Sequence, residues 1–143
     1  MQLFLGGACA GKRSIVRQRF ASPRWHSAYA GCRLEAWPSV GVSPCCLVLE
    51  GWEHWLWAAL TDEPDNERLR RRMIGELDAL RDWELKHGGE VILILLEMGR
   101  GIVPLAPEAR RLRDLNGWLA QDAAARCRRA WYVWNGLVKS LTH

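Results

Sequence analysis

The sequence feature that most constrains the fold is a glycine-rich loop between an apolar segment and a helical pattern. The apolar segment is residues 1–5 (MQLFL), and the helical pattern covers 14–20. Between them lie Gly6, Gly7, Ala8, Cys9, Ala10, Gly11, Lys12 and Arg13, followed by Ser14. Glycines let successive backbone N–H groups surround an anion, and a helix N-terminus adds partial positive charge. The loop predicts a phosphate-binding site; the alternative is a glycine-rich turn from strand to helix.

The last residues of the loop decide which chemistry it supports. In the phosphate-binding pattern Gly-x4-Gly-Lys, the lysine contacts the outer phosphates and a following Ser or Thr hydroxyl ligates magnesium. Here that last position is Arg13, and Ser14 comes one residue late. We therefore expect ATP or GTP phosphates to bind at Lys12, with one magnesium ligand missing.

Composition narrows the class of protein. The 143 residues predict a single domain, 1–143, and the net charge of +4 suits phosphates or nucleotides. The cations occur as single arginines and short pairs within helical patterns, which favours solvent-facing helices over nucleic-acid binding. Five cysteines without a C-x-x-C pair predict neither disulfides nor zinc. With neither a signal-peptide pattern nor an apolar run of about 20 residues, we expect a cytoplasmic chain without a membrane span.

Short apolar runs alternate with amphipathic segments along the chain. We predict strands at 1–5, 45–50, 90–96 and 131–137, a short edge strand at 32–37, and a loop or ragged helical turn at 21–31. Helical patterns cover 14–20, 52–60, a long segment ending near 87, and 109–127. This alternation predicts an α/β fold with a mostly parallel sheet and helices on both faces, in three layers. With the glycine loop, it indicates a P-loop NTPase-like (RecA-like) domain.

Two predicted strands end in a carboxylate, Glu50 and Glu97. Ligands of such sheets bind at the carboxyl ends of the strands, where the glycine loop also lies. A carboxylate there holds magnesium or orients the attacking group. We expect Lys12, Glu50 and Glu97 to be catalytic, with Glu50 as a candidate magnesium ligand. The alternative for both carboxylates is helix capping or loop anchoring.

The sequence becomes specific from Glu97 onward, where EMGRGIVP (97–104) precedes RRLRDLNG (110–117). This block resembles the adenosylcobinamide kinase / adenosylcobinamide-phosphate guanylyltransferase family of cobalamin biosynthesis. That family carries N-E-V-G-x-G-I-V-P, then A-R-x-F-R-D-x-x-G-x-x-N-Q. The matching positions include Gly99, Gly101, Ile102, Val103, Pro104, Arg110, Arg113, Asp114, Gly117, Gln121 and Gly136. Residues 6–13 and 45–60 resemble the family's G-G-A-R-S-G-K-S loop and its apolar strand with following helix.

The resemblance implies phosphoryl transfer from a nucleotide to the aminopropanol hydroxyl of adenosylcobinamide, with magnesium, in a homo-oligomer. It also implies nucleotide contacts from residues 6–14, from Glu50 and from Glu35, which stands in a remnant of the family's R-T-x-E stretch. The family's helix with a guanylyl-accepting histidine does not fit into the short segment 13–45. His26 is either a nucleotidyl acceptor or a histidine packed between Trp25 and Tyr29.

Three positions depart from the family pattern: Arg13, Leu96 in place of Asn, and Ala120 in place of Asn. They favour an alternative: a degenerate, catalytically impaired member that serves as a nucleotide-binding partner or regulatory subunit, with Arg13 offsetting phosphate charge in place of the metal. A third alternative is a protein–protein module, because aromatic residues concentrate at interfaces. Its surface would contain Trp52, Trp55, Trp57, Trp118, Trp131 and Trp134, which otherwise fill the core.

Overall fold

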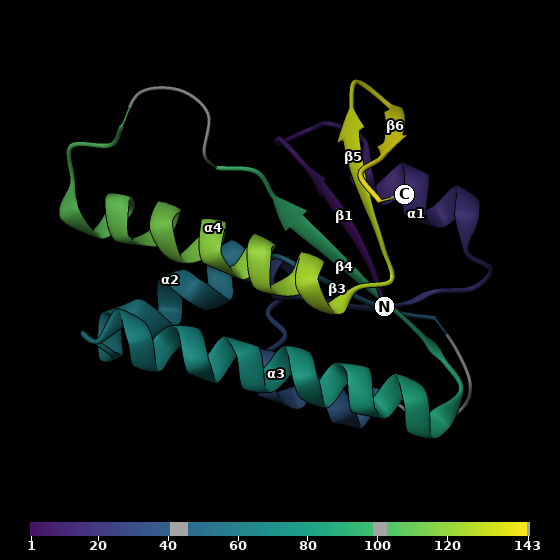
Figure 1. Ribbon diagram of the computed structural model, residues 1–143, viewed down its shortest axis with the longest axis horizontal. Coiled ribbons are helices and arrows are strands. Elements are labelled where there is room, and N and C mark those ends of the chain that lie inside the picture. The colour runs from purple at the N-terminus through teal and green to yellow at the C-terminus, as the bar shows by residue number, and fades with distance from the viewer. Residues whose placement is uncertain (41–45, 99–102, 143) are drawn as a thin grey trace.

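The computed structural model (Figure 1) describes residues 1–40, 46–98 and 103–142. They form a six-stranded sheet in the order β2-β3-β4-β1-β5-β6. Neighbouring strands are parallel except for β5 and β6, which are antiparallel. The strands are β1 (Gln2–Gly6), β2 (Arg24–Ser27), β3 (Cys46–Glu50), β4 (Glu90–Leu96), β5 (Arg129–Trp134) and β6 (Leu137–Ser140).

Helices cover both faces of the sheet, which confirms the predicted three-layer α/β architecture. They are α1 (Lys12–Arg19), α2 (Trp52–Asp62), α3 (Asn66–His87) and α4 (Pro107–Arg126), with the short 3-10 helices η1 (Ala28–Ala30) and η2 (Leu34–Val40). Alternate residues of β4 enter different cores: Leu93 packs with α2, α3 and α4, whereas Ile92 packs with α1. A strand buried on both faces has no polar side, so β4 is apolar from Val91 to Leu96. The fold is P-loop NTPase-like.

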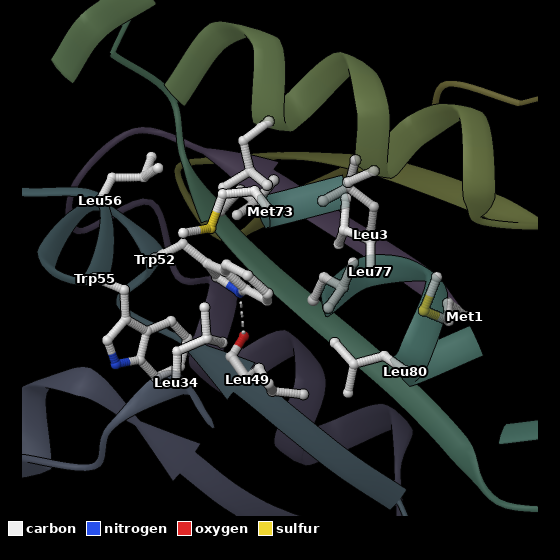
Figure 2. Packing of buried hydrophobic residues seen from close by; sticks show 14 of the residues in the cluster. Met1, Leu3, Leu34, Leu49, Trp52, Trp55, Leu56, Met73, Leu77 and Leu80 are labelled. Atoms are coloured by element: carbon white, nitrogen blue, oxygen red, sulfur yellow. Dashed lines mark hydrogen bonds between the residues drawn. The ribbon is translucent and has the colours of Figure 1, made fainter. Parts of the chain in front are cut away.

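The larger core lies between the sheet and helices α2, α3 and α4. Figure 2 shows Trp52 at its centre, fully buried, with its indole Nε1 donating to the carbonyl oxygen of Leu49 at 3.3 Å. The predicted stripe of α3 packs into this core with Leu69, Met73, Leu77 and Leu80. Because Asp65 caps the first turn of α3 and Gly88 ends the helix at φ 69°, its bounds agree with the sequence pattern. None of the described helices combines the length and apolar composition that a membrane span requires.

The segment between α1 and β3 differs from the prediction. Residues 24–27, predicted as loop, form β2, which pairs in parallel with β3. Residues 34–40 form the 3-10 helix η2, where we predicted an edge strand at 32–37. Leu34 and Trp37 are both buried. Their three-residue spacing places them on the same side of a 3-10 helix, whereas a strand would turn them to opposite faces.

The predicted last strand, 131–137, is a hairpin instead. β5 and β6 pair in antiparallel orientation, and Trp134 and Leu137 are the partners next to the turn. The turn residues Asn135 and Gly136 have φ 49° and 74°. Asn-Gly is the residue pair that favours such left-handed two-residue turns. The turn also fixes the glycine loop, because the N–H of Gly136 donates to the carbonyl oxygen of Ala10 at 2.8 Å.

Candidate functional site

The glycine loop connects β1 to α1, and its shape depends on two glycines. A Cβ atom at Gly6 would lie 2.4 Å from the carbonyl oxygen of Val133 in β5, so no side chain fits there. Gly11 precedes α1 with φ 98°, a left-handed conformation that glycine adopts without strain. A Cβ atom there would also approach Gly136 to 3.2 Å. The neighbouring strand and hairpin turn therefore hold the loop against the sheet.

A cavity of about 430 Å³ opens over this loop. Its lining residues come from the loop, the first turn of α1, and the ends of β3 and β4; they are Ala8, Cys9, Ala10, Gly11, Lys12, Arg13, Ser14, Tyr29, Glu50, Ile94 and Leu96. We call it the loop cavity. The ammonium of Lys12 donates to the carbonyl oxygens of Gly6 at 2.9 Å and Gly7 at 2.5 Å. A fixed cation and a helix N-terminus thus share one cavity, the arrangement that binds phosphate.

The Lys12 ammonium is partly withdrawn from water. Burial lowers the pKa of Lys12 from its ordinary value of 10.5, and the nearby carboxylates of Glu53, Glu50 and Glu97 oppose that shift. Burial disfavours the charged form of an amine, whereas an anion close to it favours that form. A phosphate in the loop cavity would therefore stabilise the charge that burial opposes.

Arg13 and Glu50 form an ion pair at the edge of the loop cavity. An Nη atom of Arg13 lies 2.5 Å from Oε1 of Glu50, whose side chain is only 1% exposed, against 51% for Arg13. The guanidinium also lies over the ring of Trp25, with 5.4 Å between its carbon and the ring centroid. A buried carboxylate requires a partner for its charge. Arg13 therefore neutralises Glu50.

This pairing bears on the predicted magnesium. Arg13 stands where the loop pattern has the ligating hydroxyl, and its guanidinium binds one oxygen of the candidate carboxylate ligand, Glu50. No group of three or more His, Cys, Asp or Glu side chains suited to a metal occurs in the described ranges of the chain. The donor set in this arrangement does not fit a magnesium ion.

Glu97 follows β4 and lies beside the loop. Its backbone N–H donates to the carbonyl oxygen of Gly6 at 2.9 Å, and its Oε2 accepts from the Tyr132 hydroxyl at 2.7 Å. The structure thus brings Lys12, Glu50 and Glu97 to the same edge of the sheet. Glu35 lies elsewhere, because its carboxylate pairs with Arg72 at 2.7 Å and lines a different cavity of about 210 Å³.

His26 is a buried residue of β2, only 3% exposed. Its Nε2 lies 2.7 Å from the carbonyl oxygen of Arg33, and its ring packs against Trp55 with 5.7 Å between centroids. The imidazole is thus enclosed between β2, the segment before η2, and α2. This placement favours the packing alternative over nucleotidyl transfer to His26.

Sequence reasoning missed a pair of residues close to the loop, Tyr29 and Glu53. The Tyr29 hydroxyl donates to both carboxylate oxygens of Glu53, at 2.9 and 2.7 Å, and Tyr29 lines the loop cavity. Burial raises the pKa of Tyr29, and the Glu53 carboxylate adds to the rise. Glu53 also has the largest carboxylate effect on Lys12. Its position in the first turn of α2, where an acidic residue is favourable, was the available signal.

A second cavity of about 520 Å³ lies between α4 and the end of β4. We call it the α4 cavity. It shares Leu96 with the loop cavity, and its lining residues are Leu5, Leu96, Glu97, Met98, Arg113, Asp114, Asn116, Gly117, Trp118, Ala120 and Gln121. Four residues of the recognised motif therefore meet here: Arg113, Asp114, Gly117 and Gln121. Pro104 and Arg110 line neither cavity, and Gly99 and Gly101 lie outside the described residues.

The fold and the glycine loop define a P-loop NTPase-like protein, and comparison with known proteins refines that class. Residues 39–141 match the family described as cobinamide kinase / cobinamide phosphate guanyltransferase. The chain belongs to this family. The match contains β3, β4, α4 and every lining residue of the α4 cavity except Leu5. It does not contain the glycine loop, whose assignment rests on its own sequence and geometry.

Two curated relatives are similar to the chain. The bifunctional adenosylcobalamin biosynthesis protein CobP of Pseudomonas aeruginosa is 37% identical over 93 residues, which are 64% of this chain and 50% of the relative. The bifunctional adenosylcobalamin biosynthesis protein CobU of Escherichia coli is 32% identical over 76 residues, 53% of this chain and 42% of the relative. The matched regions thus span half or less of each relative's length.

Proposed function

We propose that this chain binds ATP or GTP at the loop cavity and transfers the terminal phosphoryl group to the aminopropanol hydroxyl of adenosylcobinamide. The observation that carries the proposal is the Lys12 ammonium, which is fixed by the carbonyl oxygens of Gly6 and Gly7 beside the N-terminus of α1. Family membership supplies the substrate class, because the curated relatives are named for adenosylcobalamin biosynthesis. Together they favour a kinase acting on a corrinoid.

In the proposed reaction the acceptor hydroxyl oxygen bonds to the terminal phosphorus, and the bond to the bridging oxygen of the nucleotide breaks. The hydroxyl proton passes to Glu97, which lines the α4 cavity and directly follows Leu96, the residue that this cavity shares with the loop cavity. Lys12 and the N–H groups of the loop stabilise the negative charge on the transferred group. Arg13 holds the Glu50 carboxylate in place and adds a second cation beside the phosphates.

The proposal covers phosphoryl transfer and leaves out guanylyl transfer. The relatives are named bifunctional, but the one histidine between the glycine loop and β3 is the buried His26. A nucleotidyl acceptor needs a ring nitrogen that reaches the α-phosphate. The enclosed imidazole of His26 does not offer one.

A direct assay tests the proposal. Purified protein is incubated with adenosylcobinamide and ATP or GTP, and the phosphorylated corrinoid is measured by mass spectrometry. We expect product with the wild-type chain and none above background with Lys12→Ala, whereas Lys86→Ala, at the end of α3, retains full activity. Equal product from Lys12→Ala and the wild type contradicts the assignment of the loop as the phosphate site.

The Arg13–Glu50 ion pair favours a second candidate function. In this alternative the chain binds a nucleotide without magnesium, does not turn over, and acts as a partner or regulatory subunit. Magnesium-independent binding by calorimetry, combined with no product in the kinase assay, selects this alternative.

We also propose that the chain forms a homo-oligomer. Of the tryptophans considered for an interface, Trp52 and Trp55 are buried in the core, whereas Trp57 and Trp134 are 46% and 59% exposed. Exposed aromatic side chains favour a contact surface over core filling at these two positions. Light scattering measures the state directly, and a strict monomer at all concentrations contradicts the proposal.

A further inference from the structure

We propose that the α4 cavity is the binding site of the phosphoryl acceptor, a molecule that carries amide and hydroxyl groups but no anionic group, and that Asn116 and Gly117 determine its fit. The inference rests on the proposed kinase function, since it names the second substrate's place in that reaction. It concerns residues of the α4 helix, whereas the nucleotide is assigned to the loop cavity.

The first observation is a buried amide. Asn116 is only 2% exposed, and its side-chain Nδ2 donates to the carbonyl oxygen of Leu96 at 2.7 Å. That contact fixes the orientation of the amide, because a carbonyl oxygen accepts only from the NH₂ group. Its Oδ1 atom has no hydrogen-bond partner among the described residues. Buried acceptors are almost always paired, so this wall of the α4 cavity holds an acceptor that the described residues leave unsatisfied.

The second observation is a glycine inside α4. Gly117 lies in the middle of the helix, where glycine is less favourable than alanine. A Cβ atom at this position would meet no atom of the described residues within 4 Å, so packing against them does not require glycine. Gly117 lines the α4 cavity. The missing side chain leaves room for a ligand to approach the helix backbone.

The walls of the α4 cavity indicate the chemical class of the ligand. Glu97, Asp114 and Gln121 accept hydrogen bonds, Arg113 donates them, and Met98 and Trp118 provide apolar surface. One cation beside two carboxylates gives no positive field for a second phosphate. A molecule that carries amide N–H and hydroxyl groups and no anionic group suits this lining. A hydroxyl placed at Glu97 also lies at the border with the loop cavity, through the shared residue Leu96.

The chain offers a matched control for Gly117. Gly75 lies inside α3, and a Cβ atom there would also meet nothing within 4 Å. It is exposed like Gly117 but is not among the lining residues of the two cavities. Gly117→Ala and Gly75→Ala therefore make the same change on two helices. Only the first adds a methyl group to the α4 cavity.

The experiment measures three quantities for the wild type, Gly117→Ala and Gly75→Ala, with adenosylcobinamide as the acceptor probe. We expect Gly117→Ala to raise the KM for adenosylcobinamide and its Kd in equilibrium binding at least tenfold. Its nucleotide affinity by calorimetry stays within twofold of the wild type, and its thermal midpoint is equal or higher. Gly75→Ala changes neither substrate's binding. Asn116→Leu, which removes the orphan acceptor and the donor to Leu96, weakens adenosylcobinamide binding without weakening nucleotide binding.

The possible outcomes separate this inference from the proposed function. If turnover occurs and Gly117→Ala matches Gly75→Ala in KM and Kd, the α4 cavity is not the acceptor site and the kinase function stands. If turnover is absent but Gly117→Ala selectively weakens adenosylcobinamide binding, the cavity assignment stands and the kinase function is wrong. A wild type that binds no adenosylcobinamide overturns the inference. So does a Gly117→Ala variant whose main effect is an altered oligomeric state in light scattering, because Gly117 then lies in a subunit contact.

Discussion

The loop cavity and the α4 cavity adjoin at Leu96, yet they differ in how far they follow the family pattern. Apart from Leu5, the α4 cavity is built from residues inside the family match, and it keeps Arg113, Asp114, Gly117 and Gln121 in place. The loop cavity is built largely from residues before position 39, and it carries the charge-changing departure at Arg13. The difference indicates that the family pattern is retained at the α4 cavity, which we propose binds the acceptor, whereas the electrostatics have changed at the loop cavity, which we propose binds the phosphates.

At the loop cavity, Arg13 places a fixed cation where the loop pattern has a hydroxyl. A hydroxyl at position 13 would leave the Glu50 carboxylate free for a metal, but Arg13 pairs with it at 2.5 Å. A guanidinium is charged at every accessible pH. Because it belongs to the chain, it does not need the additional ligands that a metal ion requires. The loop cavity can therefore attract phosphate without a metal, while Lys12 keeps its usual place.

The largest effect that sharpens the comparison is expected at Lys12. Lys12→Ala removes the cation at the centre of the loop, and we expect turnover to fall on the order of 10²–10³-fold or more, as for the loss of a fixed transition-state donor. Adenosylcobinamide binding in the α4 cavity stays unchanged, because Lys12 does not line that cavity. Steady-state kinetics and equilibrium corrinoid binding check the two halves. If Lys12→Ala weakens the binding of nucleotide and of adenosylcobinamide to the same extent, the assignment of the two ligands to separate cavities is wrong.

The next largest effect is expected in the free energy of unfolding when the Arg13–Glu50 ion pair is broken. Arg13→Ala leaves a buried carboxylate unpaired, and since Arg13 is half exposed we expect a loss of about 1–3 kcal/mol in the free energy of unfolding, below the value for a fully buried pair. The double variant Arg13→Ala/Glu50→Gln is expected to recover part of this loss, measured by denaturant unfolding. Arg72→Ala, which breaks the exposed pair with Glu35, serves as control and costs about 0.5 kcal/mol or less. Additive effects at Arg13 and Glu50 would show that they are not coupled.

Gly6 and Gly7 test whether β5 fixes the loop. A methyl group at Gly6 would meet the carbonyl oxygen of Val133, whereas at Gly7 it would meet nothing within 4 Å. We expect Gly6→Ala to lower the free energy of unfolding by about 1–3 kcal/mol, as overpacked sites do. Gly7→Ala should stay within about 0.5 kcal/mol of the wild type. Equal stability of the two variants in urea contradicts the close approach of β5 to the loop.

The smallest expected effect is in the pH dependence of nucleotide binding. Burial lowers the pKa of Lys12 from its ordinary value of 10.5. In the free protein the ammonium therefore loses its proton at a lower pH than an exposed lysine does. Phosphate binds the charged form, so affinity is constant at low pH and falls as the pH rises through this lowered pKa. The sign for stability is opposite: the unfolded chain binds more protons between the folded and ordinary pKa, so this group's contribution to stability rises across that interval.

Calorimetric titrations between pH 7 and 10 check the affinity curve. Lys12→Arg keeps its charge throughout, so a variant that still binds nucleotide is expected to show a flatter profile. An identical decline in the wild type and in Lys12→Arg assigns the titration to another group.

The sequence predicted most of the sheet and the large helices because their signals are local. The continuous apolar run of β4 and the helical stripe from Leu69 to Leu80 need no tertiary information. β2 was missed because its residues RWHS form no apolar run; its strand conformation depends on pairing with β3. The β5–β6 hairpin was missed although Asn135-Gly136 was a readable turn signal.

The sequence predicted only those residues of the candidate site that lie at the ends of strands. Glu50 and Glu97 come directly after buried strands, so parallel topology brings them to the glycine loop. The Arg13–Glu50 ion pair and the Tyr29–Glu53 contact join elements that are far apart in the chain, and no local pattern encodes their distances. The same holds for Asn116, whose orphaned acceptor is visible only once α4 packs beside Leu96.

The central claim is that the loop cavity binds nucleotide through fixed cations, so one calorimetric comparison tests it most directly. ATP and GTP are titrated into the wild type and into Arg13→Ser, each with magnesium and with a chelator. We predict that wild-type affinity changes less than threefold on removing magnesium, whereas Arg13→Ser, which frees Glu50 and restores a hydroxyl, loses at least tenfold. Wild-type binding that disappears with the chelator would contradict the claim.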